Sequence, residues 1–115
     1  MKFLIVDDNA VMRQTIAAQI ADAAEEILEC DDGKDATQLY LQFHPDWVLM
    51  DISMKTVGGI EATGNIIAKD PNAKIVIVTD YDDRFFRKAA TEAGAYKFIS
   101  KDHLEELKMI VRRTI

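Results

Sequence analysis

Cysteine is almost absent from this sequence, which has Cys30 alone among its 115 residues. A single thiol excludes an internal disulfide and a thiolate metal cluster, and it is typical of a protein that works in a reducing cytoplasm. We expect Cys30 to be a small buried residue on a strand. The chain also lacks an apolar run long enough to span a membrane, and residues 1–6 are too short for a signal peptide, so we expect no membrane partner.

Basic residues are the minority among the charged ones. The chain has 14 Lys and Arg against 20 Asp and Glu, which gives a net charge of −6. Proteins bind phosphate backbones through clusters of Lys and Arg, so this balance argues against direct binding of nucleic acid. Hydrophobic residues make up 49% and charged residues 30%, the composition of an ordinary folded globule. We therefore expect one domain with one core over residues 1–115.

Sequence motifs of several enzyme classes are also missing. Gly58-Gly59 is not followed by Lys-Ser or Lys-Thr, so it is not a phosphate-binding loop. The two histidines, His44 and His103, lie far apart in different connections, which argues against a histidine metal site or a catalytic pair. No Gly-x-Ser-x-Gly or Cys/His arrangement supports a hydrolase.

Short apolar runs alternate with segments of helical spacing along the whole chain. The predicted strands are Lys2–Val6, Glu26–Cys30, Trp47–Met50, Lys74–Val78 and Lys97–Ser100. The predicted helical faces contain Met12, Ile16 and Ile20; Ala36, Leu39, Tyr40 and Phe43; Ile60, Thr63 and Ile67; Phe85 or Phe86 with Ala89, Ala90 and Ala93; and Leu104, Leu107 and Val111. This order indicates an α/β fold, a doubly wound five-stranded parallel sheet of (βα)₅, flavodoxin-like type with strand order 2-1-3-4-5.

Carboxylates follow two of the predicted strands directly. Asp7-Asp8 comes after the first strand and Asp51 after the third, and these strands are neighbours in the order 2-1-3-4-5. Thr79 and Lys101 follow the fourth and fifth strands. Because open α/β sheets place their ligand sites at the carboxyl ends of the strands, we expect all five side chains in one crevice.

Three clustered carboxylates need a cation. Like charges about 4 Å apart repel by roughly 4 kcal/mol at an effective dielectric constant of about 20. Oxygen ligands without His or Cys select a hard ion, and one or two carboxylates with several waters suit Mg²⁺. Beside such an ion a carboxylate can attack a phosphoryl donor. We assign Asp51 as the nucleophile because it stands alone at its strand end, and Asp7 and Asp8 as metal-holding residues. Thr79 and Lys101 would stabilise the transferring group.

The residues that support a family resemblance are, in chain order, Asp7-Asp8, Asp51-Ile52-Ser53-Met54, Gly59, Thr79 and Ser100-Lys101. In this order they resemble the receiver domain of two-component response regulators, over essentially the whole chain. The resemblance implies that Asp51 accepts a phosphoryl group from a histidine kinase or a histidine phosphotransfer protein. It also implies that Asp8, Asp51 and the Ser53 carbonyl bind Mg²⁺ directly, while Asp7 helps through water.

The resemblance further implies a conformational switch. Thr79 and Phe98 match the switch hydroxyl and the switch aromatic of the family, and phosphorylation would remodel the face formed by the fourth helix, the fifth strand and the fifth helix. A downstream effector domain or partner protein would bind that face. Phe85 and Phe86 are adjacent on a helix and cannot both point squarely at the core. Either one of them is exposed for partner binding, or both pack into the rim of the core.

Three positions depart from the usual pattern of the family. Position 55 is Lys instead of proline, so the loop after Asp51 is less constrained. Position 80, usually a small residue, is Asp, and this fourth acid should repel phosphodonors or hold a water or a Lys. Lys101 is followed by Asp102 instead of proline, and we expect Asp102 to cap the last helix, with Glu105 at the capping-box position.

We predict a phosphorylation-driven signalling switch in the cytoplasm, which is not an enzyme beyond self-phosphorylation from small donors and self-dephosphorylation. Two alternatives remain open at this point: a receiver-like binding module that works without phosphorylation, and a Mg²⁺-dependent phosphohydrolase. The phosphohydrolase would need a second general acid two residues after Asp51, where Ser53 stands. The sequence also leaves open whether the domain acts alone or within a longer regulator, and whether phosphorylation drives formation of a homodimer.

Overall fold

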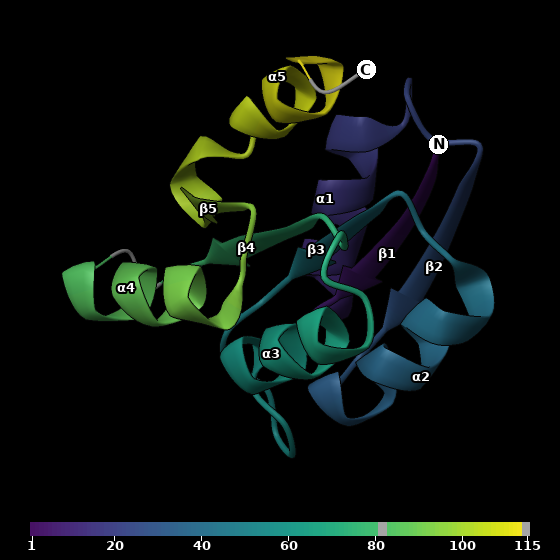
Figure 1. Cartoon of the computed structure of the whole chain (residues 1–115). Helices are drawn as coiled ribbons and strands as arrows, with labels where there is room; N and C mark the ends of the chain where they lie inside the picture. The colour runs from purple at the N-terminus through teal and green to yellow at the C-terminus, as the bar shows by residue number, and fades with distance from the viewer. Residues whose placement is uncertain (81–82, 114–115) are drawn as a thin grey trace.

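The computed structural model describes residues 1–80 and 83–113 of the chain. Its five strands are all parallel and form one sheet in the order β2-β1-β3-β4-β5, with helices on both faces (Figure 1). The elements in chain order are β1 (Lys2–Val6), α1 (Ala10–Ile20), β2 (Glu26–Cys30), α2 (Gly33–Phe43), β3 (Trp47–Met50), α3 (Gly59–Lys69), β4 (Ile75–Thr79), α4 (Arg84–Ala93), β5 (Lys97–Ser100), the 3₁₀ turn η1 (Lys101–His103) and α5 (Glu106–Arg113). The predicted fold class and strand order are confirmed.

The central strands β1, β3 and β4 are buried on both faces, as their continuous apolar runs require, whereas the edge strand β2 is largely exposed. Along β1, Leu4 and Val6 belong to the core on one side of the sheet, whereas Phe3 and Ile5 belong to the core on the other. The first core is covered by α2, α3 and α4, and the second by α1 and α5 (Figure 1). The expectation of one core is therefore replaced by two, which share the sheet between them.

The beginnings of three helices are fixed by side-chain caps. Asn9 accepts a hydrogen bond from the Met12 amide at the start of α1, and Asp83 accepts one from the Phe86 amide at the start of α4. Asp32 does the same for α2. These short polar side chains satisfy amides that have no partner within the helix.

Asp102 is not a helix cap, so that prediction is wrong. It lies inside η1, and its own backbone amide donates to the side chain of Ser100 at 3.1 Å. A serine one position before Lys101 thus starts a 3₁₀ turn, and α5 begins only at Glu106. The strand predicted over Lys74–Val78 also shifts by one residue, because β4 runs from Ile75 to Thr79.

The structure distinguishes between the two phenylalanines of α4. Phe85 is 74% exposed, whereas Phe86 packs against the core that α2, α3 and α4 cover. Cys30 and Trp47 are buried, as their positions on strands predict. Among residues 1–80 and 83–113, no helix has the length and apolar character needed to cross a bilayer.

Candidate functional site

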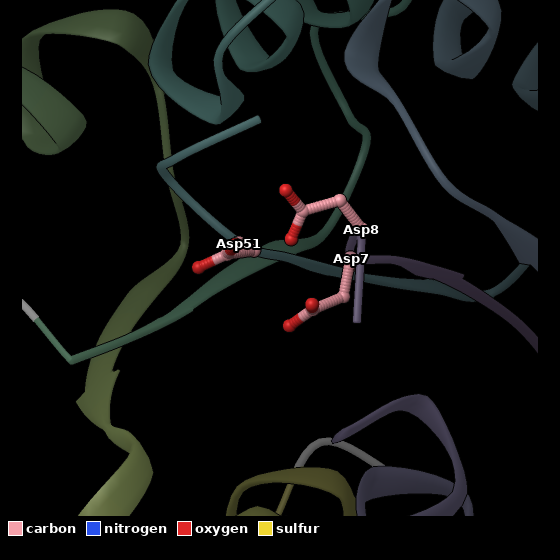
Figure 2. Close-up of side chains that lie close together, drawn as sticks. All are labelled: Asp7, Asp8 and Asp51. Atoms are coloured by element: carbon pink, nitrogen blue, oxygen red, sulfur yellow. The ribbon is translucent and has the colours of Figure 1, made fainter. Parts of the chain in front are cut away.

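The candidate site lies at the carboxyl ends of β1 and β3, which are adjacent in the sheet. Val6 and Met50, the last residues of these strands, are partners in the β1–β3 register, and the Asp51 amide donates to the Val6 carbonyl at 2.9 Å. Asp7 and Asp51 therefore leave the sheet side by side. Figure 2 shows the carboxylates of Asp7, Asp8 and Asp51 extending to the same side of these strand ends.

The three carboxylates form a compact cluster. One oxygen from each of Asp7, Asp8 and Asp51 lies within 4.8 Å of the others. Asp7 is fully buried and Asp51 is only 5% exposed, whereas Asp8 is exposed to solvent. The predicted clustering of the acids at one edge of the sheet is confirmed by this geometry.

Lys101 joins the cluster from the end of β5. Its Nζ atom lies 3.0 Å from Asp7 Oδ2 and 3.3 Å from Asp51 Oδ1. Burial lowers the pKa of this ammonium group, but its contacts with Asp7 and Asp51 raise the pKa by more than burial lowers it. The pKa of Lys101 therefore lies above the ordinary value. Lys101 is therefore a fixed positive charge between two of the acids.

Asp51 is held in an environment that disfavours its charge. Burial, and then the charge of Asp7, raise its pKa from 3.8 to about 6, although Lys101 acts in the opposite direction. At neutral pH the carboxylate is ionised and destabilised. Such a group is a better nucleophile and a better ligand for a cation than an exposed aspartate.

The residues present fit a divalent cation of the hard type. Three carboxylates cluster here, and the one ammonium group of Lys101 is shared between Asp7 and Asp51, so the cluster keeps an excess of negative charge. Asp7 Oδ2 is buried and, apart from its ion pair with Lys101, has no hydrogen bond of acceptable geometry among the described residues. Oxygen-only ligands of this kind select Mg²⁺, Ca²⁺ or Mn²⁺ over softer metals.

The other predicted site residues lie around this cluster. Thr79 is fully buried at the last position of β4, the strand next to β3. Ser53 lies two residues beyond Asp51, in the loop between β3 and α3 (residues 51–58), which we call the β3–α3 loop. Asp80 follows Thr79 and is exposed.

Gly59 explains why α3 can begin so close to the strand end. An ideal Cβ atom at this position would lie 1.8 Å from the backbone oxygen of Asp51 and 2.7 Å from its carbonyl carbon. The Gly59 amide donates to the Ile52 carbonyl at 2.8 Å. Only glycine permits this approach of the helix to the backbone of Asp51.

Sequence reasoning missed Arg13. The Nη1 atom of Arg13 donates to the backbone carbonyl of Asp7 at 2.6 Å, and its Nε atom donates to Glu29 at 2.8 Å. Arg13 thus connects the first strand end to the edge strand β2. Its position one turn into α1 gives no sign of this contact, because an arginine there is equally typical of a solvated helix face.

Sequence reasoning also missed Asp32. Its carboxylate is only 5% exposed and accepts hydrogen bonds from three backbone amides, two of which belong to the β3–α3 loop. These bonds, led by those from Lys34 and Val57, lower its pKa from 3.8 to about 2. An aspartate before Gly33 at the start of a helical pattern signals a cap, but the partners 24 and 25 residues away leave no trace in the local sequence.

Comparison with known proteins gives one consistent result. A family model of the response regulator receiver domain matches residues 3–112. The chemotaxis protein CheY of Thermotoga maritima is 39% identical over 101 residues, which cover 87% of this chain and 84% of CheY. The response regulator GacA of Pseudomonas aeruginosa is 34% identical over 116 residues, which cover 98% of this chain and 54% of GacA. This chain therefore spans about half the length of GacA.

The same result comes from solved structures. A two-component response regulator of the LuxR family from Aurantimonas sp. SI85-9A1 matches with a TM-score of 0.89 at 31% identity, covering 98% of this chain and 83% of that one. The response regulator domain of Thermotoga maritima CheB matches with a TM-score of 0.86 at 28% identity, covering 98% of this chain and 94% of that one.

Proposed function

This chain belongs to the family of response regulator receiver domains, and we propose that it is a signalling switch in which Asp51 accepts a phosphoryl group. The observation that supports this most directly is the pairing of a buried, charge-destabilised Asp51 with a fixed ammonium group at 3.3 Å and two further carboxylates. A nucleophile, a cation for the transferring group and a ligand set for a divalent metal are then present together.

The phosphoryl donor we propose is a phosphohistidine on a histidine kinase or a histidine phosphotransfer protein. An oxygen of Asp51 forms the new P–O bond as the P–N bond of the donor breaks, and the released imidazole takes a proton from water. Asp8, Asp51 and the Ser53 carbonyl would hold Mg²⁺, with Asp7 acting through water. When bound, the ion offsets the charge of the phosphoryl oxygens.

Lys101 and Thr79 have complementary roles in this proposal. The Lys101 ammonium lies between Asp7 and Asp51 and would contact the phosphoryl group with a positive charge. The buried hydroxyl of Thr79 would donate to a phosphoryl oxygen from the neighbouring strand. Phosphorylation adds up to about two negative charges, so the Thr79 hydroxyl would move toward Asp51, where the Lys101 ammonium already lies.

The output surface we propose is formed by α4, β5 and α5. Phe98 is half-buried on β5, and the guanidinium of Arg87 from α4 lies 4.7 Å from the centre of its ring. A hollow of about 680 Å³ on this face is lined by Tyr96, Phe98 and Met109, among others. Movement of Thr79 toward Asp51 would free space for Phe98 to turn inward and change this surface, to which an effector domain, a partner protein or a second copy of the chain would bind.

The second candidate function is a receiver-like module that binds partners without phosphorylation. Exposed Asp80, directly after Thr79, is the observation that favours it. A unit charge about 10 Å away in water changes the free energy of an approaching anion by roughly 0.4 kcal/mol, which slows a phosphodonor about two-fold. We expect this to reduce the rate of phosphorylation and not to prevent it.

The test is intact mass spectrometry after incubation with acetyl phosphate, with Mg²⁺ and with a chelator. We expect one phosphoryl adduct that needs Mg²⁺, that is absent from Asp51→Asn and that forms faster in Asp80→Ala. Asp31→Asn, which removes an exposed carboxylate nearby, is the matched control and should keep the adduct. An adduct on Asp51→Asn would overturn the assignment of the acceptor. Absence of any adduct from the wild type and from Asp80→Ala would favour the binding module.

A further inference from the structure

The β3–α3 loop carries two of the three proposed direct metal ligands, Asp51 and Ser53. It has no regular secondary structure between the end of β3 and the start of α3. Position 55 within it is an exposed Lys, which does not restrict the backbone as a proline would. A backbone carbonyl can coordinate a cation well only if the loop that carries it is held in place. The question is which contacts hold it.

The second half of the loop, which leads to α3, is held by Asp32. Asp32 Oδ2 accepts a hydrogen bond from the Thr56 amide at 2.8 Å, and Oδ1 accepts one from the Val57 amide at 3.0 Å. Oδ1 also accepts from the Lys34 amide at 3.0 Å, which caps α2. One buried carboxylate therefore joins the start of α2 to residues 56 and 57.

Gly33 brings the loop and α2 into direct contact. Its amide donates to the Val57 carbonyl at 3.2 Å, and an ideal Cβ atom at Gly33 would lie only 2.4 Å from that same oxygen. The loop thus lies against the helix start with no space between them. Both the backbone of Gly33 and the side chain of Asp32 fix the position of Val57.

This contact adjoins the carboxylate cluster. A cavity of about 190 Å³ is lined by Asp32, Thr56 and Asp8, together with Asp31, Lys34 and Lys55. The charge of Asp32 is satisfied by three backbone amides, so it does not need the metal as a partner. Asp32 shares this cavity with Asp8 but has all its hydrogen bonds with backbone amides, which is the arrangement of a supporting residue.

We propose that Asp32 is a positioning residue for the metal site, because it holds residues 56 and 57 against α2 and so preorganises the Ser53 carbonyl for the cation. The proposal rests on the proposed function, in which Ser53 is a metal ligand. Removal of a residue that supports metal ligands in this way typically weakens metal binding 10- to 100-fold.

Three substitutions separate the effects that Asp32 could have. Asp32→Ser keeps a good cap for α2, but its shorter side chain cannot reach Thr56 and Val57. Asp32→Asn keeps one acceptor oxygen and loses the other. Asp31→Asn removes the same charge from the neighbouring position, which is exposed and lines the same cavity. If charge alone mattered, all three variants would weaken metal binding to a similar extent.

The experiment is a calorimetric Mg²⁺ titration of the full chain after removal of metal with a chelator. We expect Asp32→Ser to weaken Mg²⁺ binding about ten-fold, Asp32→Asn to weaken it less, and Asp31→Asn to change it less than about three-fold. At saturating Mg²⁺, the rate of phosphorylation by acetyl phosphate should return to near the wild-type rate in Asp32→Ser. A general loss of structure would lower that rate at every Mg²⁺ concentration.

Hydrogen exchange of the metal-free protein gives a second measurement. The amides of Thr56 and Val57 should exchange faster in Asp32→Ser than in the wild type or in Asp31→Asn. Equal Mg²⁺ affinities of Asp32→Ser and Asp31→Asn would overturn the proposal. If Asp32→Ser does not fold, the Mg²⁺ affinities of Asp32→Asn and Asp31→Asn are compared instead, and equal affinities would again overturn the proposal. A wild-type chain that binds no Mg²⁺ would instead overturn the proposed function.

Discussion

At the scale of single residues, the site depends on unfavourable electrostatics that the rest of the fold compensates. Asp51 is 5% exposed and lies beside buried Asp7, so its charge is opposed by both desolvation and repulsion. Lys101 offsets only part of this, because one ammonium faces three acids. Asp51, the proposed nucleophile, therefore destabilises the metal-free protein, and the cation that we propose for this site would remove that penalty.

The stability of the metal-free protein should fall between pH 4 and pH 6. The pKa of Asp51 is raised from 3.8 to about 6, so the folded state binds more protons than the unfolded state in this range, and stability decreases as the pH rises. Two pH units correspond to about 3 kcal/mol as an upper value. Urea denaturation in the presence of a chelator should show this decrease.

Asp51→Asn tests the origin of the effect. At pH 7 without metal, this variant should have a free energy of unfolding about 1–3 kcal/mol higher than the wild type, because it removes a buried charge without changing the volume of the side chain. In this variant the decrease in the free energy of unfolding between pH 4 and pH 6 should also disappear. A variant less stable than the wild type under these conditions would mean that Lys101 compensates Asp51 fully.

At the scale of elements, helix ends decide where the chain turns. His44 ends α2 in the left-handed conformation, with φ of 52°, and its amide donates to the Tyr40 carbonyl at 2.9 Å. It is the only residue other than glycine with positive φ among residues 1–80 and 83–113. A side chain with a Cβ atom pays about 1–2 kcal/mol for this conformation.

His44→Gly should therefore stabilise the protein. We expect the free energy of unfolding to rise by up to about 1 kcal/mol, because glycine adopts positive φ without steric cost and loses part of this gain to its greater freedom in the unfolded chain. His44→Ala is the matched control, which removes the imidazole but keeps the Cβ atom and should give no gain. Thermal and urea denaturation at pH 7 measure the difference, and an equal gain in both variants would contradict the backbone explanation.

The positions of the strands and helices could be predicted from the sequence, whereas the contacts between the ends of these elements could not. Apolar runs of four or five residues located the strands, and only β4 was displaced, by one residue. The prediction for Asp102 was wrong because Ser100, two residues earlier, caps the turn η1, and the local sequence does not show which of two nearby polar residues acts as a cap. Phe85 and Phe86 could not be distinguished until the packing of α4 against the sheet was known.

The candidate site was predictable to the extent that it follows from strand order. Once β1 and β3 are neighbours, Asp7, Asp8 and Asp51 must meet, and they do. Arg13 and Asp32 could not be found in this way, because each acts on the backbone of a distant segment and carries no recognisable motif.

At the scale of the whole molecule, one sheet separates two cores. The strands β1, β3, β4 and β5 contribute side chains to both cores, so neither core can be lost without disturbing the other. Trp47 is the only tryptophan of the chain and lies fully buried in the core under α1 and α5, with its ring 5.5 Å from that of Tyr96. Its fluorescence therefore reports on one core alone.

Ile66→Ala tests whether the two cores unfold together. Ile66 is a fully buried residue of α3, on the face of the sheet opposite Trp47, and its truncation should cost about 2–5 kcal/mol. In urea, the midpoints measured by Trp47 fluorescence and by circular dichroism should shift equally. Val11→Ala, at a position 70% exposed, is the control and should change stability by less than about 0.5 kcal/mol. A fluorescence midpoint that does not move would show that the cores unfold separately.

Gly59 has a consequence for how such a protein tolerates variation. With a Cβ atom 1.8 Å from the Asp51 oxygen, any other amino acid at position 59 would displace either α3 or the strand end that carries Asp51, the proposed phosphoacceptor. In a library of random variants selected for signalling, position 59 should therefore accept as few replacements as position 51. A position can thus be invariant under selection without contributing a single atom to the chemistry, because its contribution is the volume that it leaves empty.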